Sequence, residues 1–329
     1  MHRTRTTPAA KRIAAVIVVA LLAAPIVPSI ARASRRGPQT AIIAAAGDIS
    51  PADSRLQDDD VARMIRNDIN PDAVLVLGDA QYEAGSLAEF RHYYAAGWGV
   101  RDLMRITYPV PGNHEYDVGA GETVDDPAAG YFGYFRGRAA VNPNGVRARA
   151  GFYSFNLGAW HLVALNSKSG APLSSPQIRW FKRDLSRNRK RCELAFWHHP
   201  RWSSGVEHGS DADMQRAWSV AVNGGVDVVL TGHEHVYERF QRKGENGRPI
   251  SNRSRADGAR EFVVGTGGKG GNDGFGPAVP GSQWRLPATG EASVFGALRM
   301  RLQPDAYRWA MLDETGAVLD AGGPVRCHA

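Results

Sequence analysis

The chain has 329 residues but only two cysteines, Cys192 and Cys327. So few thiols disfavour a structural zinc site, which usually recruits thiolate ligands. A disulfide between the two cysteines is compatible with an oxidising compartment, where it would close a long loop and stabilise the fold by roughly 2 to 4 kcal/mol. Two free buried thiols are the alternative, and the sequence leaves both open.

The sequence also lacks an uninterrupted apolar run of the roughly 20 residues that a membrane-spanning helix needs. The apolar run Ile13 to Ala24 follows four basic residues and precedes Ala31-Arg32-Ala33, a small-x-small cleavage pattern. This three-part pattern predicts a signal peptide over residues 1–33 and a secreted, extracytoplasmic protein. An uncleaved anchor is the alternative, but Pro25 and Pro28 interrupt the segment. We therefore expect no stable membrane anchor after cleavage.

An excess of charge of one sign is missing from the rest of the chain. Residues 1–33 hold five of the 40 basic side chains and no acidic one, which leaves 35 basic against 33 acidic side chains downstream. A nucleic-acid partner would require a clustered basic face, whereas the basic excess lies in the leader. We expect no nucleic-acid partner.

Two common signatures of enzymes are absent as well. No Gly-x-Ser-x-Gly elbow occurs, which disfavours a serine hydrolase of the α/β-hydrolase kind. The glycine-rich run Gly265 to Gly274 contains Lys269, but Gly270 follows where a phosphate-binding Walker loop requires Ser or Thr. We interpret this run as a turn-forming loop beside the functional crevice.

Short apolar runs alternate with amphipathic segments, which predicts an α/β fold. No linker interrupts the pattern, so we expect a single domain over residues 38–329. The stretch from Asp117 to Ala150 is predicted to be dominated by loops, and the apolar runs Phe262 to Val264, Val294 to Leu302, Tyr307 to Leu312 and Val318 to Asp320 are predicted to form an antiparallel set. The expected strands before Phe262 are Ala41 to Ala46, Ala73 to Leu77, Tyr108 to Pro111, Phe152 to Phe155, Trp160 to Asn166, Leu194 to Trp197 and Val226 to Leu230; the expected helices are Gln57 to Ile69, Ser86 to Trp98, Ser175 to Arg187 and Asp211 to Val222.

Five of the predicted strands end in side chains that can bind metal ions. These are Asp48, Asp79 with Tyr82, Asn113 with His114, His198 with His199, and His233 with His235. Each alone has an ordinary explanation, such as a helix cap, a turn or a buried histidine. Five together indicate a shared crevice, since loops at the carboxyl ends of strands lie on one side of an open α/β sheet.

The mixture of oxygen and imidazole ligands suits Fe, Mn or Zn in a catalytic role. A carboxylate such as Asp79 can bridge two ions. Two ions about 3.5 to 4 Å apart would hold the attacking and leaving oxygens of a phosphoryl group and lower the pKa of a bound water.

In the order GDIS, GDAQYE, GNHE, FWHHP and GHEHVYER, these blocks resemble the five-block signature of calcineurin-like metallophosphoesterases. The resemblance covers about residues 41 to 240 and is to the purple acid phosphatase branch. Ser50 stands where many members of the superfamily have a histidine, and Tyr82 stands three residues after Asp79 as in the purple enzymes. The resemblance implies a β-sandwich of two mixed sheets flanked by helices.

The resemblance also implies the roles of individual residues. Asp48, Tyr82 and His235 would bind Fe(III), and Asp79 would bridge to a second, divalent ion of Fe, Zn or Mn. Asn113, His198 and His233 would bind that second ion.

Two histidines are implied outside the ligand set. His114 would contact phosphate or help the leaving oxygen accept a proton, and His208 would act as an acid histidine near the metals. For His208 a plain surface position is the alternative, and His199 would replace His198 if the strand register moved by one residue. Tyr82 has an alternative interpretation as a packing aromatic residue.

The function expected from these residues is hydrolysis of small phosphate monoesters by attack of metal-bound hydroxide, as in acid phosphatases. A phosphodiesterase or nucleotidase on the same fold is the first alternative. A secreted binding module without catalysis is a more distant one.

Overall fold

The computed structural model describes residues 39–51, 57–117, 128–137, 150–167, 173–251, 258–271, 274–288 and 292–328. Residues 36–329 form one compact unit. Within the described ranges, no helix is long and apolar enough to cross a bilayer. The predicted signal peptide over residues 1–33 lies outside the described residues.

The first sheet has six strands in the order β13-β12-β11-β1-β2-β3. Its strands are β1 (Ala41–Ala46), β2 (Ala73–Leu77), β3 (Thr107–Val110), β11 (Gly296–Leu302), β12 (Ala306–Asp313) and β13 (Val318–Arg326). β1, β2 and β3 run parallel, whereas β11, β12 and β13 pair antiparallel with their neighbours. The sheet is therefore half parallel and half antiparallel.

The second sheet has seven strands in the order β10-β8-β9-β7-β6-β5-β4. Its strands are β4 (Tyr153–Leu157), β5 (Trp160–Ala164), β6 (Cys192–Phe196), β7 (Val228–Thr231), β8 (Tyr237–Phe240), β9 (Arg260–Val264) and β10 (Ser282–Leu286). The prediction of one antiparallel set after Phe262 was wrong in part, because β9 pairs parallel with β7 in this sheet. β8 and β10 were not predicted, since their sequences are too polar to give an apolar run.

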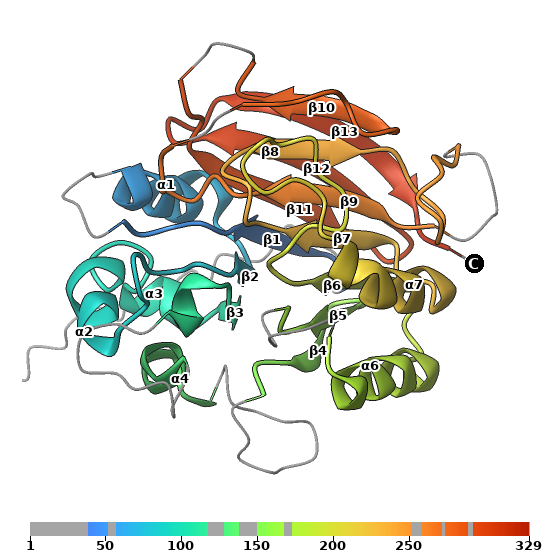
Figure 1. The fold of residues 1–329 in the computed structure, drawn as a ribbon, viewed down its shortest axis with the longest axis horizontal. Coiled ribbons are helices and arrows are strands. Elements are labelled where there is room, and N and C mark those ends of the chain that lie inside the picture. Colours follow the sequence, from blue (N-terminus) through green and yellow to red (C-terminus); the bar gives the residue numbers. More distant parts are fainter. Residues whose placement is uncertain are drawn as a thin grey trace, which may run out of the picture. The chain divides into compact units, whose positions relative to one another are not determined.

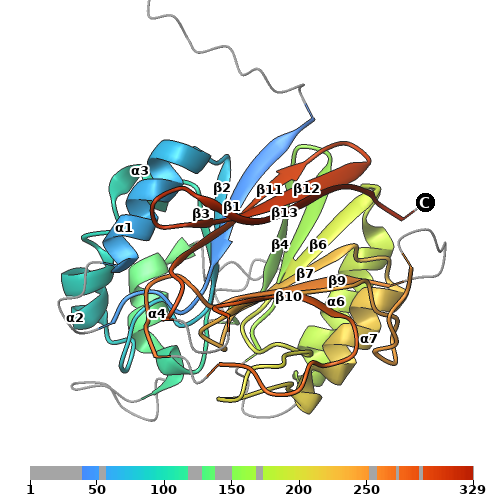
Figure 2. The ribbon, with the colours of Figure 1, turned by 90° about the horizontal axis from the view of Figure 1, so that it is seen from above.

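The two sheets pack face to face, with helices outside them (Figures 1 and 2). Ile43, Leu75 and Leu298 of the first sheet belong to the same buried cluster as Leu194 and Leu230 of the second. Because side chains alternate along a strand, Ala195 and Trp197 point the other way and pack with helices α6 (Ser175–Arg187) and α7 (Gln215–Asn223). The predicted sandwich of two mixed sheets flanked by helices is confirmed.

Helices also cover the parallel half of the first sheet. The helix predicted from Gln57 to Ile69 is confirmed, but its second half, η1 (Ile65–Ile69), has π-helical hydrogen bonding after α1 (Gln57–Met64). The predicted helix at Ser86 is confirmed at its start, because Ser86 and Glu89 form a capping box on α2 (Leu87–Glu89).

The remaining helical segments of the described residues are η2 (Phe90–Tyr94), α3 (Arg101–Met104), η3 (His114–Tyr116), α4 (Ala129–Phe135) and η4 (Ala212–Met214). α4 lies in the stretch that was predicted to consist mainly of loops.

Cys192 and Cys327 form a disulfide, with their Cα atoms 5.4 Å apart. Cys192 begins β6 in the second sheet, and Cys327 follows β13 in the first. The bond therefore ties the end of the chain to the opposite sheet, as the first of the two sequence alternatives predicts.

Candidate metal centre

The predicted ligands meet where the parallel strands of both sheets end. Asp48 follows β1, Asp79 follows β2, and Asn113 lies just beyond β3. From the second sheet, His198 follows β6 and His233 follows β7. The Nδ1 atom of His198 lies 2.9 Å from the Leu77 carbonyl oxygen at the end of β2, which joins the two edges directly.

One group of donor atoms surrounds the hydroxyl of Tyr82. The Tyr82 oxygen lies 2.9 Å from Asp48 Oδ1, 3.2 Å from Asp79 Oδ2 and 3.1 Å from His235 Nε2. The other ring nitrogen of His235 lies 2.9 Å from the Gly271 carbonyl oxygen, to which it can only donate. That bond orients the ring so that Nε2 faces the group.

A second group surrounds His198 Nε2. This nitrogen lies 3.1 Å from Asn113 Oδ1, 3.2 Å from His233 Nδ1 and 3.2 Å from Asp79 Oδ2. The same Asp79 oxygen is therefore a member of both groups. All seven predicted ligands lie in these two adjoining groups.

These donor atoms fit two cations. Oxygen and nitrogen ligands about 2.1 Å from one ion lie roughly 3 Å from each other, which matches the spacings in both groups. The carboxylates of Asp48 and Asp79 and the ring of His198 are buried away from water. A buried pair of carboxylates with imidazoles is the arrangement that a multivalent cation stabilises.

Without a cation, the electrostatic environment favours the charge state that a metal ligand requires at Asp79 and His233. At Asp48, His198 and Tyr82 the pKa is raised, so a cation has to displace the proton from these three groups. Burial raises the pKa of Asp79, but the neighbouring His198 outweighs it and holds the pKa of that carboxyl below its usual range. Burial lowers the pKa of His233, and the imidazoles around it, His198 first, lower it further, so this ring stays neutral. Burial and then the charge of Asp48 raise the pKa of Tyr82 well above 10. A Tyr82 phenolate therefore needs a strongly charged cation beside it.

The backbone is strained at the centre. Asp48, Asp79 and His233 have positive φ angles of 58°, 44° and 74°. A left-handed conformation costs a non-glycine residue roughly 1 to 2 kcal/mol, so the surroundings must hold it in place. Gly78 has a φ of 91°, and a Cβ atom there would collide with the His198 ring. The glycine before Asp79 thus allows the two strand ends to approach each other.

Two buried glutamates that the sequence analysis missed brace the loops of the centre. Glu115 accepts hydrogen bonds from the backbone amides of Gly112, Asp79 and Ala80, at 2.6, 3.0 and 2.7 Å. Glu234 accepts hydrogen bonds from the amides of His208 and Gly209. Glu115 belongs to the block GNHE and Glu234 to the block GHEH. In the sequence, the position of each glutamate next to a predicted site histidine was the only sign that it could belong to the site.

The glycine-rich run lies beside the metal ligands, as predicted. The Lys269 amide donates to the Asp48 carbonyl oxygen at 2.9 Å, and the Gly267 amide donates to the Gly47 carbonyl oxygen at the same distance. The Lys269 ammonium pairs with Glu83 and lies 4.6 Å from the centroid of the Tyr82 ring. The run therefore forms one wall of the centre and places a positive charge near it.

The histidines predicted outside the ligand set lie on different sides of the centre. The His114 ring lies 4.3 Å from the Tyr82 ring, and its Nδ1 is 2.5 Å from the Glu83 carbonyl oxygen. The His208 ring stacks on His233 with centroids 4.0 Å apart. His199 Nδ1 is 2.8 Å from Ser167 Oγ, although a ring nitrogen of His199 also lies near those of His198 and His233. His198, and not His199, contacts Asp79 and Asn113.

The chain is similar to plant purple acid phosphatases. It is 28% identical over 211 residues to purple acid phosphatase 15 of Arabidopsis thaliana, and the match covers 56% of this chain and 38% of that protein. It is 25% identical to the Fe(3+)-Zn(2+) purple acid phosphatase 12 of the same plant, over 52% of this chain and 37% of that protein. The chain thus spans less than half the length of these relatives.

The same fold occurs in a solved structure of purple acid phosphatase PPD1 from yellow lupin, Lupinus luteus. The two structures superpose with a TM-score of 0.66 at 19% identity, over 87% of this chain and 53% of the lupin chain. The resemblance to the purple acid phosphatase branch is confirmed by these similarities. The family model described as calcineurin-like phosphoesterase matches residues 42–237, which is more than half of the sequence, and the chain therefore belongs to the calcineurin-like phosphoesterase family.

Proposed function

We propose that the protein is a dinuclear-metal phosphoesterase that hydrolyses phosphate monoesters. The observation that carries this proposal is the position of Asp79. Its Oδ2 atom lies 3.2 Å from the Tyr82 hydroxyl oxygen in one group of donors and 3.2 Å from His198 Nε2 in the other. A shared carboxylate between two sets of donors is the arrangement that a pair of neighbouring metal ions requires.

Each group of donors would hold one ion. Asp48, Tyr82 and His235 would bind Fe(III), because a buried phenolate is favoured only next to a high positive charge. The other set would bind a divalent ion of Fe, Zn or Mn through Asn113, His198 and His233. When bound, the two ions would neutralise charge on the phosphoryl oxygens and make a bound water more acidic.

We propose that His114 helps the leaving oxygen of the substrate to accept a proton. The Glu83 carbonyl oxygen can only accept a hydrogen bond, so His114 Nδ1 carries the hydrogen in their 2.5 Å contact. The opposite nitrogen, Nε2, is then free to exchange a proton with a substrate oxygen. His208 is proposed to act as an acid histidine on the side of His233, on which its ring stacks.

The activity is tested with one aryl phosphate monoester and the matching aryl diester, on protein loaded with iron and zinc. We expect faster turnover of the monoester, and Asp79→Ala should lose metal retention and turnover together. Faster turnover of the diester would replace this proposal with a phosphodiesterase on the same fold. No turnover of either ester by the fully loaded protein would favour a binding module without catalysis.

We also propose that the chain is exported and works outside the cytoplasm on a small phosphate ester. The disulfide between Cys192 and Cys327 supports export, because such bonds persist mainly in oxidising compartments. Fractionation of expressing cells, with mass spectrometry of the mature N-terminus, tests it. A cytoplasmic protein that retains residues 1–33 would contradict this part of the proposal.

A further inference from the structure

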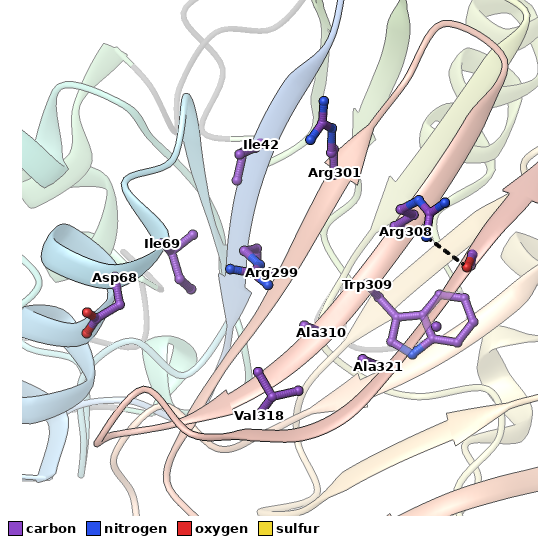
Figure 3. A pocket seen from close by; sticks show the side chains of 12 residues that line it. Ile42, Asp68, Ile69, Arg299, Arg301, Arg308, Trp309, Ala310, Val318 and Ala321 are labelled. Atoms are coloured by element: carbon purple, nitrogen blue, oxygen red, sulfur yellow. Dashed lines mark hydrogen bonds between the residues drawn. The ribbon is translucent and has the colours of Figure 1, made fainter. Parts of the chain in front are cut away.

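A second concentration of charge lies in the antiparallel half of the first sheet. A cavity of about 710 Å³ opens there between η1 and strands β1, β11, β12 and β13, and Figure 3 shows the side chains that line it. Three of these side chains are arginines, namely Arg299, Arg301 and Arg308. We call the cavity with these three side chains the arginine pocket. The only acidic residue among the lining residues is Asp68. None of the predicted metal ligands lines the cavity.

The register of the strands places the three arginines on one face of the sheet. Arg301 of β11 stands directly opposite Arg308 of β12, and Arg299 stands opposite Ala310. Since residues two apart on a strand share a face, Arg299 and Arg301 project from the same side of the sheet. Figure 3 shows Arg299 and Arg301 on one strand and Arg308 on the next.

The cavity is open because the residues in line with Arg299 on the two neighbouring strands are small. Ala310 of β12 pairs with Arg299 on one side and with Ala321 of β13 on the other. Apolar side chains complete the floor and rim, among them Ile42 and Val318. Val318 is 56% exposed and contributes apolar surface to the cavity.

The arginines are poorly compensated by the protein itself. In the described part of the chain, the guanidinium groups of Arg299 and Arg301 make no hydrogen bond or ion pair, and Arg308 donates only to the Gly323 carbonyl oxygen, at 3.1 Å. Like charges directly opposite each other on neighbouring strands destabilise a sheet. Such a pair is therefore mildly unfavourable in the sheet, and an anion bound between its members would stabilise it.

We propose that the arginine pocket binds a small organic phosphate, with the phosphate on the guanidinium groups and an apolar ring over the floor. Guanidinium forks match the geometry of phosphate oxygens and form strong charge-assisted hydrogen bonds with them. A volume of about 710 Å³ accommodates a molecule of that size. The site is separate from the metal centre, since Ile42 lies near the start of β1 whereas Asp48 follows its end, and the extended part of the chain between them spans more than about 10 Å.

The experiment is calorimetric titration of the metal-loaded, full-length protein with phenylphosphonate, whose phosphorus–carbon bond a phosphoesterase does not cleave. We expect two binding events in the wild-type protein. One should persist in Asp79→Ala and be weakened at least about tenfold in the double variant Arg301→Ala/Arg308→Ala, because each arginine supplies charge-assisted bonds. Turnover should be unchanged in the double variant.

The matched control is Arg179→Ala/Arg183→Ala, which removes the same charge from the exposed face of α6. If this control weakens binding as much as the pocket variant, the effect is only one of net charge and the proposal is overturned. Unchanged binding by the folded pocket variant would also overturn it, as would a single event in the wild type that Asp79→Ala removes. Binding to the arginine pocket does not require metal. The loss of this binding can therefore be distinguished from a failure of the proposed phosphoesterase activity.

A comparison with methylphosphonate tests the apolar part of the site. Phenylphosphonate should bind the arginine pocket at least about threefold more tightly, because its ring buries apolar surface on the floor. Equal affinities would show that the ring does not contact the floor of the pocket. The pocket would then be a site for a simple oxyanion, and the proposal of an organic phosphate would be wrong.

Discussion

The metal centre and the arginine pocket both bring like charges together, but the two clusters differ in burial and in their contacts with the rest of the protein. At the metal centre, Asp48 and Asp79 are buried, and backbone amides and imidazoles contact both carboxylates. In the arginine pocket, Arg301 and Arg308 are exposed, and solvent rather than a protein partner offsets most of their charge. The first cluster is held in place by contacts with the protein, whereas the second has few such contacts.

This difference predicts opposite responses to mutation. A change at the metal centre should cost stability, metal affinity or rate, because many contacts depend on each group. A change in the arginine pocket should cost only ligand affinity, and it should stabilise the protein without ligand. The four predictions below test that contrast, from the largest expected effect to the smallest.

Glu115→Ala should have the largest effect, because it leaves the buried amides of Gly112, Asp79 and Ala80 without their acceptor. Each such loss costs roughly 1 to 3 kcal/mol, so the free energy of unfolding should fall by more than about 3 kcal/mol. Loss of a group that orients metal ligands typically weakens metal binding roughly 10- to 100-fold. Denaturant unfolding and metal titration measure both effects.

Glu115→Gln is the matched variant, because it keeps the shape and one acceptor oxygen. It should lose less stability than Glu115→Ala. Wild-type stability and metal affinity in Glu115→Ala would show that the glutamate does not brace the centre.

His114→Ala should keep both metal ions and lose turnover roughly 10²- to 10⁴-fold, since a group that transfers a proton contributes about that factor. The exposed residue His92 offers a control, and His92→Ala should leave turnover within twofold of the wild type. Elemental analysis and aryl phosphate turnover measure the pair. Equal turnover in the two variants would remove His114 from the mechanism.

His208→Ala should have a smaller effect, because its ring stacks on His233 and its Nε2 lies 3.8 Å from Glu207, which is not one of the predicted metal ligands. We expect kcat/KM to fall by about tenfold, equivalent to about 1.4 kcal/mol, with metal content unchanged. A loss of metal from this variant would instead make His208 a support of His233. Turnover equal to that of His92→Ala would assign His208 to the plain surface position.

Arg301→Gln should have the smallest effect and the opposite sign. Removing one of two like charges that face each other across β11 and β12 should raise the free energy of unfolding by about 0.2 to 1 kcal/mol without ligand. Arg326→Gln is the control, since Arg326 is exposed and faces Ala306 instead of a charge. A lower stability of Arg301→Gln than of the control would mean that the arginines support the fold.

The sequence was sufficient to predict that these side chains meet, because the blocks that carry them follow a regular pattern. Each ligand block comes directly after an apolar strand, so the strand period and the rule for parallel strand ends place the side chains without any knowledge of distant contacts. His198 and His233 could be placed beside Asp79 in this way, although they are more than a hundred residues away from it in the chain.

Other features depended on contacts that no local pattern reveals. Glu115 and Glu234 act through amides of neighbouring loops, and an acid in a loop is usually solvated. The arginine pocket depends on the register that sets Arg301 opposite Arg308 and on the small residues beyond them. β9 looked like a member of an antiparallel tail, but its pairing with β7 is decided by the packing of the second sheet.

The central claim, that one buried cluster holds two neighbouring cations through a shared carboxylate, is tested most directly by counting metal ions. Elemental analysis should find two transition-metal ions per chain in the purified wild-type protein and fewer than one in Asp79→Ala. One ion or none in an active wild-type protein, or two ions retained by Asp79→Ala, would contradict the claim.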